Sequence, residues 1–222
     1  MVSRGILTLS LVLVLMGCAG PSERAVPIET EDIHIKKIAI MPFEAYMGLN
    51  RYQESIQCPL CGTVFRKGRI ERDAEERLTT LVFDYLRVNT QYKLIPPTHV
   101  RGAMSQIFSR RFDSNSIPFM VDIGKAVGAD AVLVSYVYRY KERVGTSYSA
   151  KSPASVAFDL HLVSVKKGTI LWKGGFDGTQ KSLSENIFQI RRFFKRGAKW
   201  LTVDEWASQG LEQAMKTFPK YY

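Results

Sequence analysis

The feature that most constrains this chain is an apolar run from Ile6 to Met16, interrupted only by Thr8 and Ser10. As a helix with a rise of about 1.5 Å per residue, the run would be roughly 16 Å long, about half of the roughly 30 Å that a bilayer core requires. It is too short to span a membrane in the usual way. Behind the single charge of Arg4 it fits the hydrophobic segment of a secretory signal, so the sequence predicts export.

The run ends in Leu15-Met16-Gly17-Cys18, which resembles the lipobox of bacterial lipoproteins. The resemblance implies that residues 1–17 are a signal peptide, that cleavage falls between Gly17 and Cys18, and that the Cys18 sulfur carries a covalent lipid with acyl chains such as palmitate. At about 0.8 kcal/mol per buried CH₂, two or three chains hold a soluble domain firmly at a bilayer. The alternative is a short buried helix that opens a cytoplasmic domain. Ala19-Gly20 replaces the aspartate that often retains such proteins at the inner membrane, which favours the outer membrane and a domain facing the periplasm.

Beyond the predicted cleavage point, residues 18–32 hold two prolines, small residues and mixed charge, and predict a flexible tether. Residues 33–222 are long enough for a single domain. The net charge of +10 would suggest nucleic acid for a protein inside a cell, but an exported protein meets anionic headgroups and peptidoglycan carboxylates instead. We therefore expect membrane lipid and an envelope protein or peptidoglycan as partners, and no nucleic acid.

Hydrophobic patterns predict about five strands, at His34–Phe43, Tyr92–Ile95, Ala129–Tyr140, 156–163 and Ile170–Phe176. Helices are predicted at Asp73–Asn89, Thr98–Phe108 and Pro118–Val127, with two more at the carboxy terminus. Capping-box spacing occurs in the pairs Asp73 with Glu76, Ser182 with Glu185 and Thr202 with Glu205. The order of elements predicts an α/β (α+β) fold, a mixed sheet with helices packed on it, in one domain with an insertion at 44–70.

Three segments, in this order after the lipobox, resemble a group of envelope lipoproteins and periplasmic domains: Lys37–Phe43 (KIAIMPF), Gly128–Val134 (GADAVLV) and Val163–Trp172 (VSVKKGTILW). The group includes the TolB amino-terminal domain, the curli-secretion lipoprotein family and the lipoprotein activators of peptidoglycan synthases. The resemblance covers about residues 34–180 and implies a noncatalytic domain that binds other envelope proteins. The curli channel builds its pore from long amphipathic hairpins, whereas Tyr140–Ser155 is short and polar, so we expect no pore here.

The sharpest internal motif is Cys58-Pro59-Leu60-Cys61-Gly62, which has the form of a zinc knuckle. A full zinc site needs two more ligands, and the sequence has no second CxxC; His34, His99 and His161 are scattered along it. The exported location favours a local disulfide between Cys58 and Cys61 first, a metal knuckle second and redox activity last. Zinc shared by two chains, with both cysteines from each, is a further alternative.

A basic segment near the carboxy terminus mixes cations with aromatic residues. On a helix, Arg192, Lys195, Arg196 and Lys199 would gather on one side, and Arg191 precedes them in the segment. This segment is a candidate contact with anionic headgroups or an acidic partner. The alternative, which we favour, is an amphipathic helix that packs its apolar stripe and leaves its charges in water.

The sequence contains no GxSxG, no HExxH and no phosphate-cradling glycine loop, so we expect no catalytic residues, no enzyme activity and no cofactor beyond the lipid on Cys18. Asp159 and His161 lie two apart on the predicted outer face of one strand and are expected to be exposed. The predicted function is a noncatalytic, lipid-anchored envelope lipoprotein that binds another envelope component. The alternatives are a structural subunit of an envelope secretion or transport assembly, in which case an oligomer is possible, and a periplasmic metal-binding or thiol-redox protein that uses Cys58 and Cys61.

Overall fold

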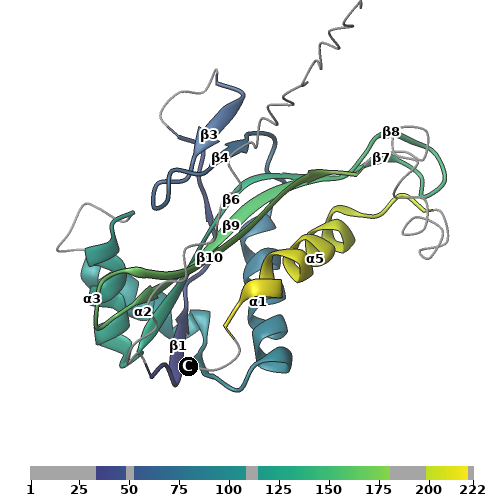
Figure 1. The fold of residues 1–222 in the computed structure, drawn as a ribbon. Helices are drawn as coiled ribbons and strands as arrows, with labels where there is room; N and C mark the ends of the chain where they lie inside the picture. The colour runs from purple at the N-terminus through teal and green to yellow at the C-terminus, as the bar shows by residue number, and fades with distance from the viewer. Residues whose placement is uncertain (1–33, 49–52, 109–114, 181–198, 220–222) are drawn as a thin grey trace, which may run out of the picture. The chain divides into compact units, whose positions relative to one another are not determined.

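The computed structural model describes residues 34–48, 53–108, 115–180 and 199–219 (Figure 1). These residues fall in one compact unit, Asp32–Tyr222. The predicted signal peptide, the tether and the helix expected after Ser182 lie outside the described residues. Within the described ranges, no helix has both the length and the apolar character needed to cross a bilayer.

A six-stranded mixed sheet forms the centre of this unit, in the order β10-β9-β6-β1-β5, with the short β2 paired to β6. β1, β5, β6 and β2 run parallel to one another where they pair, and β9 and β10 are added antiparallel. This confirms the predicted fold class, and β2 is a strand that the sequence did not predict. The bounds are β1 Lys37–Ile40, β2 Glu44–Ala45, β5 Lys93–Ile95, β6 Ala131–Lys141, β9 Ser155–Ser164 and β10 Ile170–Thr179.

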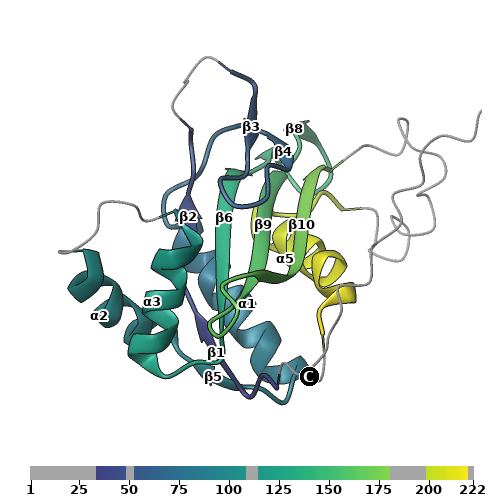
Figure 2. The ribbon, with the colours of Figure 1, turned by 60° about the vertical axis from the view of Figure 1, so that its left-hand side comes forward.

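Helices cover both faces of the sheet (Figure 2). On one face lie α1 (Ala74–Asn89) and α5 (Val203–Ala214), whose apolar stripes pack against the sheet in one hydrophobic core. On the other face lie α2 (Pro97–Phe108) and α3 (Ile117–Val127), in a second core. Both faces of β1 are therefore buried, as its uninterrupted apolar centre predicted.

The predicted insertion at 44–70 contains a second structural layer. β3 (Ser55–Gln57) and β4 (Val64–Arg66) form a two-stranded antiparallel sheet, which we call the ribbon, residues 55–66. Ile56 and Phe65 belong to the core that also holds α2 and α3, so the ribbon covers the part of the sheet that these helices leave open (Figures 1 and 2). A smaller hairpin, β7 (Val144–Gly145) with β8 (Ala150–Ser152), occupies the polar stretch after β6, and η3 (Met215–Thr217) follows α5.

The structure confirms the predicted ends of two helices and contradicts the predicted start of a third. Thr202 and Glu205 form the predicted capping box of α5, and Gly128 ends α3 in the left-handed conformation. The capping box predicted at Asp73 is wrong, because Asp73 has a φ of 64° and its side chain accepts no hydrogen bond from the first turn of α1. The chain enters this helix from a tight turn in which the Ala74 amide donates to the Glu71 carbonyl, 3.3 Å away.

β9 was predicted to have one buried face, and the structure corrects this. Every residue of Ser155–Ser164 is buried. Phe158 and Leu160 face α1 and α5, as predicted, but Ala157 and Val163 lie in the opposite core. The predicted outer face of β9 is covered because the ribbon and α3 lie over it, and this places Asp159 and His161 in the interior.

Candidate functional site

The loop between β3 and β4 folds as a knuckle around the Cys58 sulfur. The Cys58 amide donates to the Thr63 carbonyl at 2.8 Å, and the Gly62 amide donates to the Cys58 carbonyl at 3.0 Å. Gly62 has a φ of 70°, a left-handed conformation that glycine adopts without a steric penalty. The amides of Leu60 and Cys61 both point at Cys58 Sγ, at 3.3 and 3.4 Å. Two N–H donors on one sulfur stabilise negative charge there.

Two side chains of β9, Asp159 and His161, lie against this knuckle. His161 Nε2 lies 3.6 Å from Cys58 Sγ and 3.6 Å from Asp159 Oδ2. One ligand atom from each of Cys58, Cys61, Asp159 and His161 lies within 4.8 Å of all the others. We call these four residues the C2DH cluster. The sequence placed His161 apart from the cysteines and exposed it together with Asp159; both expectations are wrong, since the fold brings β9 directly under the ribbon.

The cluster is shielded from solvent. Cys58 and Asp159 are each 3% exposed, His161 is 0% exposed, and Cys61 is half-buried. Asp159 Oδ2 accepts a hydrogen bond from the Tyr138 hydroxyl at 3.0 Å. Asp159 Oδ1 and His161 Nδ1 are buried with no hydrogen-bond partner among the described residues. Such atoms are uncommon in native interiors and call for an explanation, such as an ion.

Burial and neighbouring groups shift the pKa values within the cluster. Burial raises the pKa of Asp159 to about 6, against the opposing effect of the adjacent His161. The hydrogen bond between the thiols lowers the pKa of Cys61 to about 3, and the same bond together with burial raises that of Cys58. Burial also raises the pKa of Tyr138, which keeps its phenol protonated as a donor to Asp159. Two thiols and a carboxyl thus lie close enough together to shift one another's pKa values.

Contacts away from the cysteines hold the ribbon in place. The Phe65 ring stacks on the Tyr138 ring, with centroids 4.5 Å apart and planes 15° from parallel. A Cβ at Gly175 would lie 3.4 Å from Phe65 Cζ and 3.3 Å from Asp159 Cβ, so this glycine of β10 leaves room for both. At the open end of the ribbon, the Arg139 guanidinium donates to the Arg66 carbonyl and the Asp177 carboxylate accepts from the Arg66 amide.

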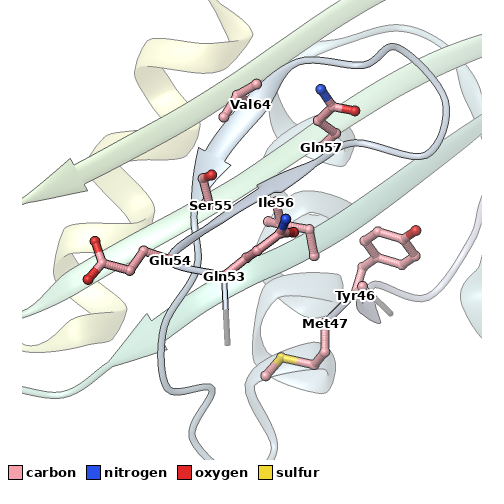
Figure 3. A pocket seen from close by; sticks show the side chains of 9 residues that line it. Tyr46, Met47, Gln53, Glu54, Ser55, Ile56, Gln57 and Val64 are labelled. Atoms are coloured by element: carbon pink, nitrogen blue, oxygen red, sulfur yellow. The ribbon is translucent and has the colours of Figure 1, made fainter. Parts of the chain in front are cut away.

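Beside the ribbon lies a cavity of about 510 Å³ (Figure 3). Figure 3 shows Tyr46 and Met47 on one side of it and the β3 residues Ile56 and Gln57 on the other. The described residues that line it include no histidine and no cysteine, and Glu54 is their single carboxylate. None of the four residues of the C2DH cluster therefore lines this cavity.

A thiol, an imidazole and a carboxylate can form a nucleophilic triad, but the geometry here differs. In a triad the nucleophile faces one ring nitrogen and the carboxylate orients the other. In the C2DH cluster both the Cys58 sulfur and the Asp159 carboxylate face His161 Nε2, while Nδ1 has no partner within the part of the chain that the structure describes. This arrangement does not orient an imidazole as a base. Both cysteines are free thiols in the structure.

Of the predicted basic contact surface, Lys199 alone lies within the described residues, and Arg191, Arg192, Lys195 and Arg196 lie outside them. Lys199 is exposed and belongs to no helix, which corrects its predicted helical position. The reason is local: the Gln180 side chain donates to the Lys199 carbonyl at 3.3 Å and accepts from the Leu201 amide at 2.9 Å, so these backbone groups are bound by a side chain and not by a helix. Lys199 Nζ lies 5.8 Å from the centre of the Tyr148 ring.

The sequence carried a signal for the cluster that the one-sided interpretation of β9 missed. The face that was predicted to be exposed contains Ala157, Asp159, His161 and Val163. Two of these four residues are apolar, which an exposed face does not favour and a covered face does. A covered face would have placed the aspartate and the histidine in the interior, where polar groups need partners.

No family model and no curated protein matches the sequence. Solved structures are similar to it at low identity. The LpoB C-terminal domain from Salmonella enterica is 16% identical with a TM-score of 0.40, over 68% of this chain and 87% of that one. Lipoprotein GNA1162 from Neisseria meningitidis is 15% identical with a TM-score of 0.43, over 73% and 94%. A PelC dodecamer from Paraburkholderia phytofirmans is 12% identical with a TM-score of 0.44, over 82% and 87%.

The solved structures to which the chain is similar thus include a lipoprotein, in agreement with the resemblance that the sequence shows.

Proposed function

We propose that this chain is a noncatalytic envelope lipoprotein, held at a membrane by lipid on Cys18, whose domain at 33–222 faces the periplasm and binds another envelope component. The observation that carries the proposal is the sequence Leu15-Met16-Gly17-Cys18 at the end of an apolar run too short to span a bilayer. Ala19-Gly20 after the cysteine favours the outer membrane. The component bound is an envelope protein or a cell-wall polymer.

The C2DH cluster supports a noncatalytic role. Cys58, Asp159 and His161 are almost completely buried, and His161 faces its neighbours through a single nitrogen. A substrate would have to displace the ribbon to reach these groups. A buried set of reactive side chains that converge on one another, and not on a cleft, fits structural work better than turnover.

The anchor is tested with the full-length chain expressed in a bacterium that lipidates exported proteins. Cells carrying wild type, Cys18→Ser or Cys58→Ser are fractionated, and the intact mass of each product is measured. Wild type and Cys58→Ser are expected in the membrane fraction with an acylated amino terminus at residue 18. Cys18→Ser is expected without lipid and with its leader uncut. A wild-type protein that lacks lipid, or that stays in the cytosol, would overturn the proposal.

Partner binding is tested by crosslinking in intact cells, followed by mass spectrometry of the crosslinked peptides. Crosslinks from the domain to another envelope protein, or to peptidoglycan fragments, are the expected result. They should weaken in Cys18→Ser, because the domain is no longer held at the membrane surface. Crosslinks confined to other copies of the chain would instead point to a subunit of an assembly and would contradict the proposed role.

A further inference from the structure

We propose that Cys58, Cys61, Asp159 and His161 bind one Zn²⁺ ion, and that this ion fastens the ribbon to β9. The inference concerns the interior of the domain and does not depend on the lipid anchor. It revises the sequence expectation of no metal, under which a zinc knuckle lacked two of its four ligands. The fold supplies these two ligands from β9, about a hundred residues further along the chain.

The distances match those of a tetrahedral zinc site. Zinc binds sulfur at about 2.3 Å and imidazole nitrogen at about 2.0–2.1 Å, which puts sulfur and nitrogen ligands of one tetrahedron roughly 3.5 Å apart. Cys58 Sγ and His161 Nε2 are 3.6 Å apart. His161 Nε2 and Asp159 Oδ2 are also 3.6 Å apart. The nitrogen–oxygen separation is longer than a good hydrogen bond, and both separations suit two ligands of a common ion.

The strongest support for a bound cation is that two ligand atoms face the same ring nitrogen of His161. His161 Nε2 can donate only one proton, yet a sulfur and a carboxylate oxygen both face it at the same distance. No protonation state gives both neighbours a good hydrogen bond from that nitrogen. A cation at the common point accepts the lone pairs of the nitrogen, the oxygen and the sulfurs together. It also neutralises negative charge that burial would otherwise make costly.

The surrounding groups are those that zinc sites use. The amides of Leu60 and Cys61 point at Cys58 Sγ, as in a zinc knuckle, and stabilise its thiolate form. The Tyr138 hydroxyl donates to Asp159 and fixes the orientation of that carboxylate, which is a common outer-shell contact at metal sites. Asp159 Oδ1 has no hydrogen-bond partner among the described residues, so the carboxylate can bind the ion through Oδ2 as it lies or turn to present Oδ1. Two thiolates with an imidazole exclude Ca²⁺ and Mg²⁺, which take oxygen ligands.

The number of protein ligands indicates a structural and not a catalytic zinc site. Four protein ligands complete the tetrahedron that zinc prefers in structural sites, so no open position remains for a water or a substrate. Two of the ligands come from the ribbon and two from β9, with 103 residues between Cys58 and His161. The ion therefore crosslinks two layers of the fold, as a disulfide between distant residues would.

A local disulfide between Cys58 and Cys61 is the competing state. It would remove both thiolates and leave Asp159 and His161 buried without a cation. The two states are distinguished on the full-length wild-type lipoprotein, purified in detergent without chelator from cells grown with added zinc. Metal content is measured by mass spectrometry of the elements, and free thiols are counted by alkylation under denaturing conditions with and without reductant. One zinc per chain with two thiols that need no reductant is expected.

Variants then test the ligands. Cys61→Ser and His161→Ala are each expected to reduce the bound zinc at least tenfold, whereas His99→Ala, which removes an exposed histidine of α2, should keep one zinc per chain. If either ligand variant fails to fold, cobalt exchanged into the wild type replaces it as the test. Intense visible absorption typical of tetrahedral Co²⁺ with thiolate ligands is expected. A wild type without stoichiometric metal, a Cys58–Cys61 disulfide, or full zinc content in both ligand variants would overturn the proposal.

Discussion

Replacing Arg139 with methionine should loosen the ribbon at the end opposite its cysteines. Arg139 is buried in β6, and its side chain is 9% exposed. Its guanidinium donates to the Arg66 carbonyl at 2.5 Å, to Asp177 Oδ1 at 2.5 Å and to Ser155 Oγ at 2.6 Å. Asp177 in turn accepts from the Arg66 amide at 2.8 Å. Arg139 and Asp177 therefore hold both backbone groups of the last ribbon residue.

The size of the effect follows from burial. Removing one partner of a buried ion pair costs about 3–5 kcal/mol, because the other charge stays buried without compensation. Asp177 is 29% exposed and keeps its bond from the Arg66 amide, so water offsets part of that cost. Methionine retains the apolar stem against which Gly68 packs. We expect a loss of about 2–3 kcal/mol in the free energy of unfolding, or a Tm lower by about 5–10 °C for a domain of this size.

The assay is thermal unfolding of the full-length lipoprotein in detergent at fixed, saturating zinc, paired with amide hydrogen exchange across residues 55–66. Arg69→Met is the matched control, because the Arg69 side chain is 73% exposed and pairs with Glu71 at the surface. That control is expected to stay within about 0.5 kcal/mol of wild type. If Arg139→Met destabilises the protein no more than Arg69→Met, or leaves exchange in the ribbon unchanged, the reasoning about this contact is refuted.

Three further predictions use other parts of the molecule. Removing the metal with a chelator should raise hydrogen exchange in residues 55–66 and leave α5 protected; equal exchange with and without chelator would contradict the fastening role. Thr202→Ala should cost about 1 kcal/mol and lower Tm by a few degrees, because it removes the capping box of α5; an unchanged Tm would argue against that cap. Gly124→Ala should cost about 1–3 kcal/mol in thermal unfolding, because its Cβ would lie 2.8 Å from Val132 Cγ2 and closer still to Val165; a neutral result would mean that α3 can move off the sheet freely.

The parts of the fold that the sequence predicted well depend on local patterns. The apolar centres of β1 and β6 indicate strands covered on both faces, and the stripe of α1 indicates which side meets the sheet. Thr202 with Glu205 is a local signal as well, since both partners of the capping box lie within one turn. The same spacing at Asp73 failed because the backbone entering α1 is left-handed, which spacing alone does not reveal.

The sequence predicted the two cysteines of the candidate site but not the two residues of β9 that join them. The knuckle is local, and the spacing of Cys58 and Cys61 is sufficient to suggest it. Asp159 and His161 come from a strand that follows the cysteines by about a hundred residues, so their contact depends on where the ribbon docks. No periodicity within β9 specifies that docking. Arg139 was missed for the same reason: its partners Arg66 and Asp177 lie on other elements and are recognisable only once the layers are assembled.

The ribbon also explains why a metal would be useful in this fold. Its two strands have three residues each, and an isolated two-stranded hairpin of any length is marginally stable in water. Yet this short element must cover a face of β9 that holds a carboxylate and an imidazole. Stacking of Phe65 on Tyr138 contributes about 0.5–1.5 kcal/mol beyond the area that it buries, which is little for such a task. An ion bound by two ribbon cysteines and by the two polar groups of β9 would act on both problems with one set of contacts: it neutralises the buried carboxylate and thiolates, and it holds the ribbon against β9.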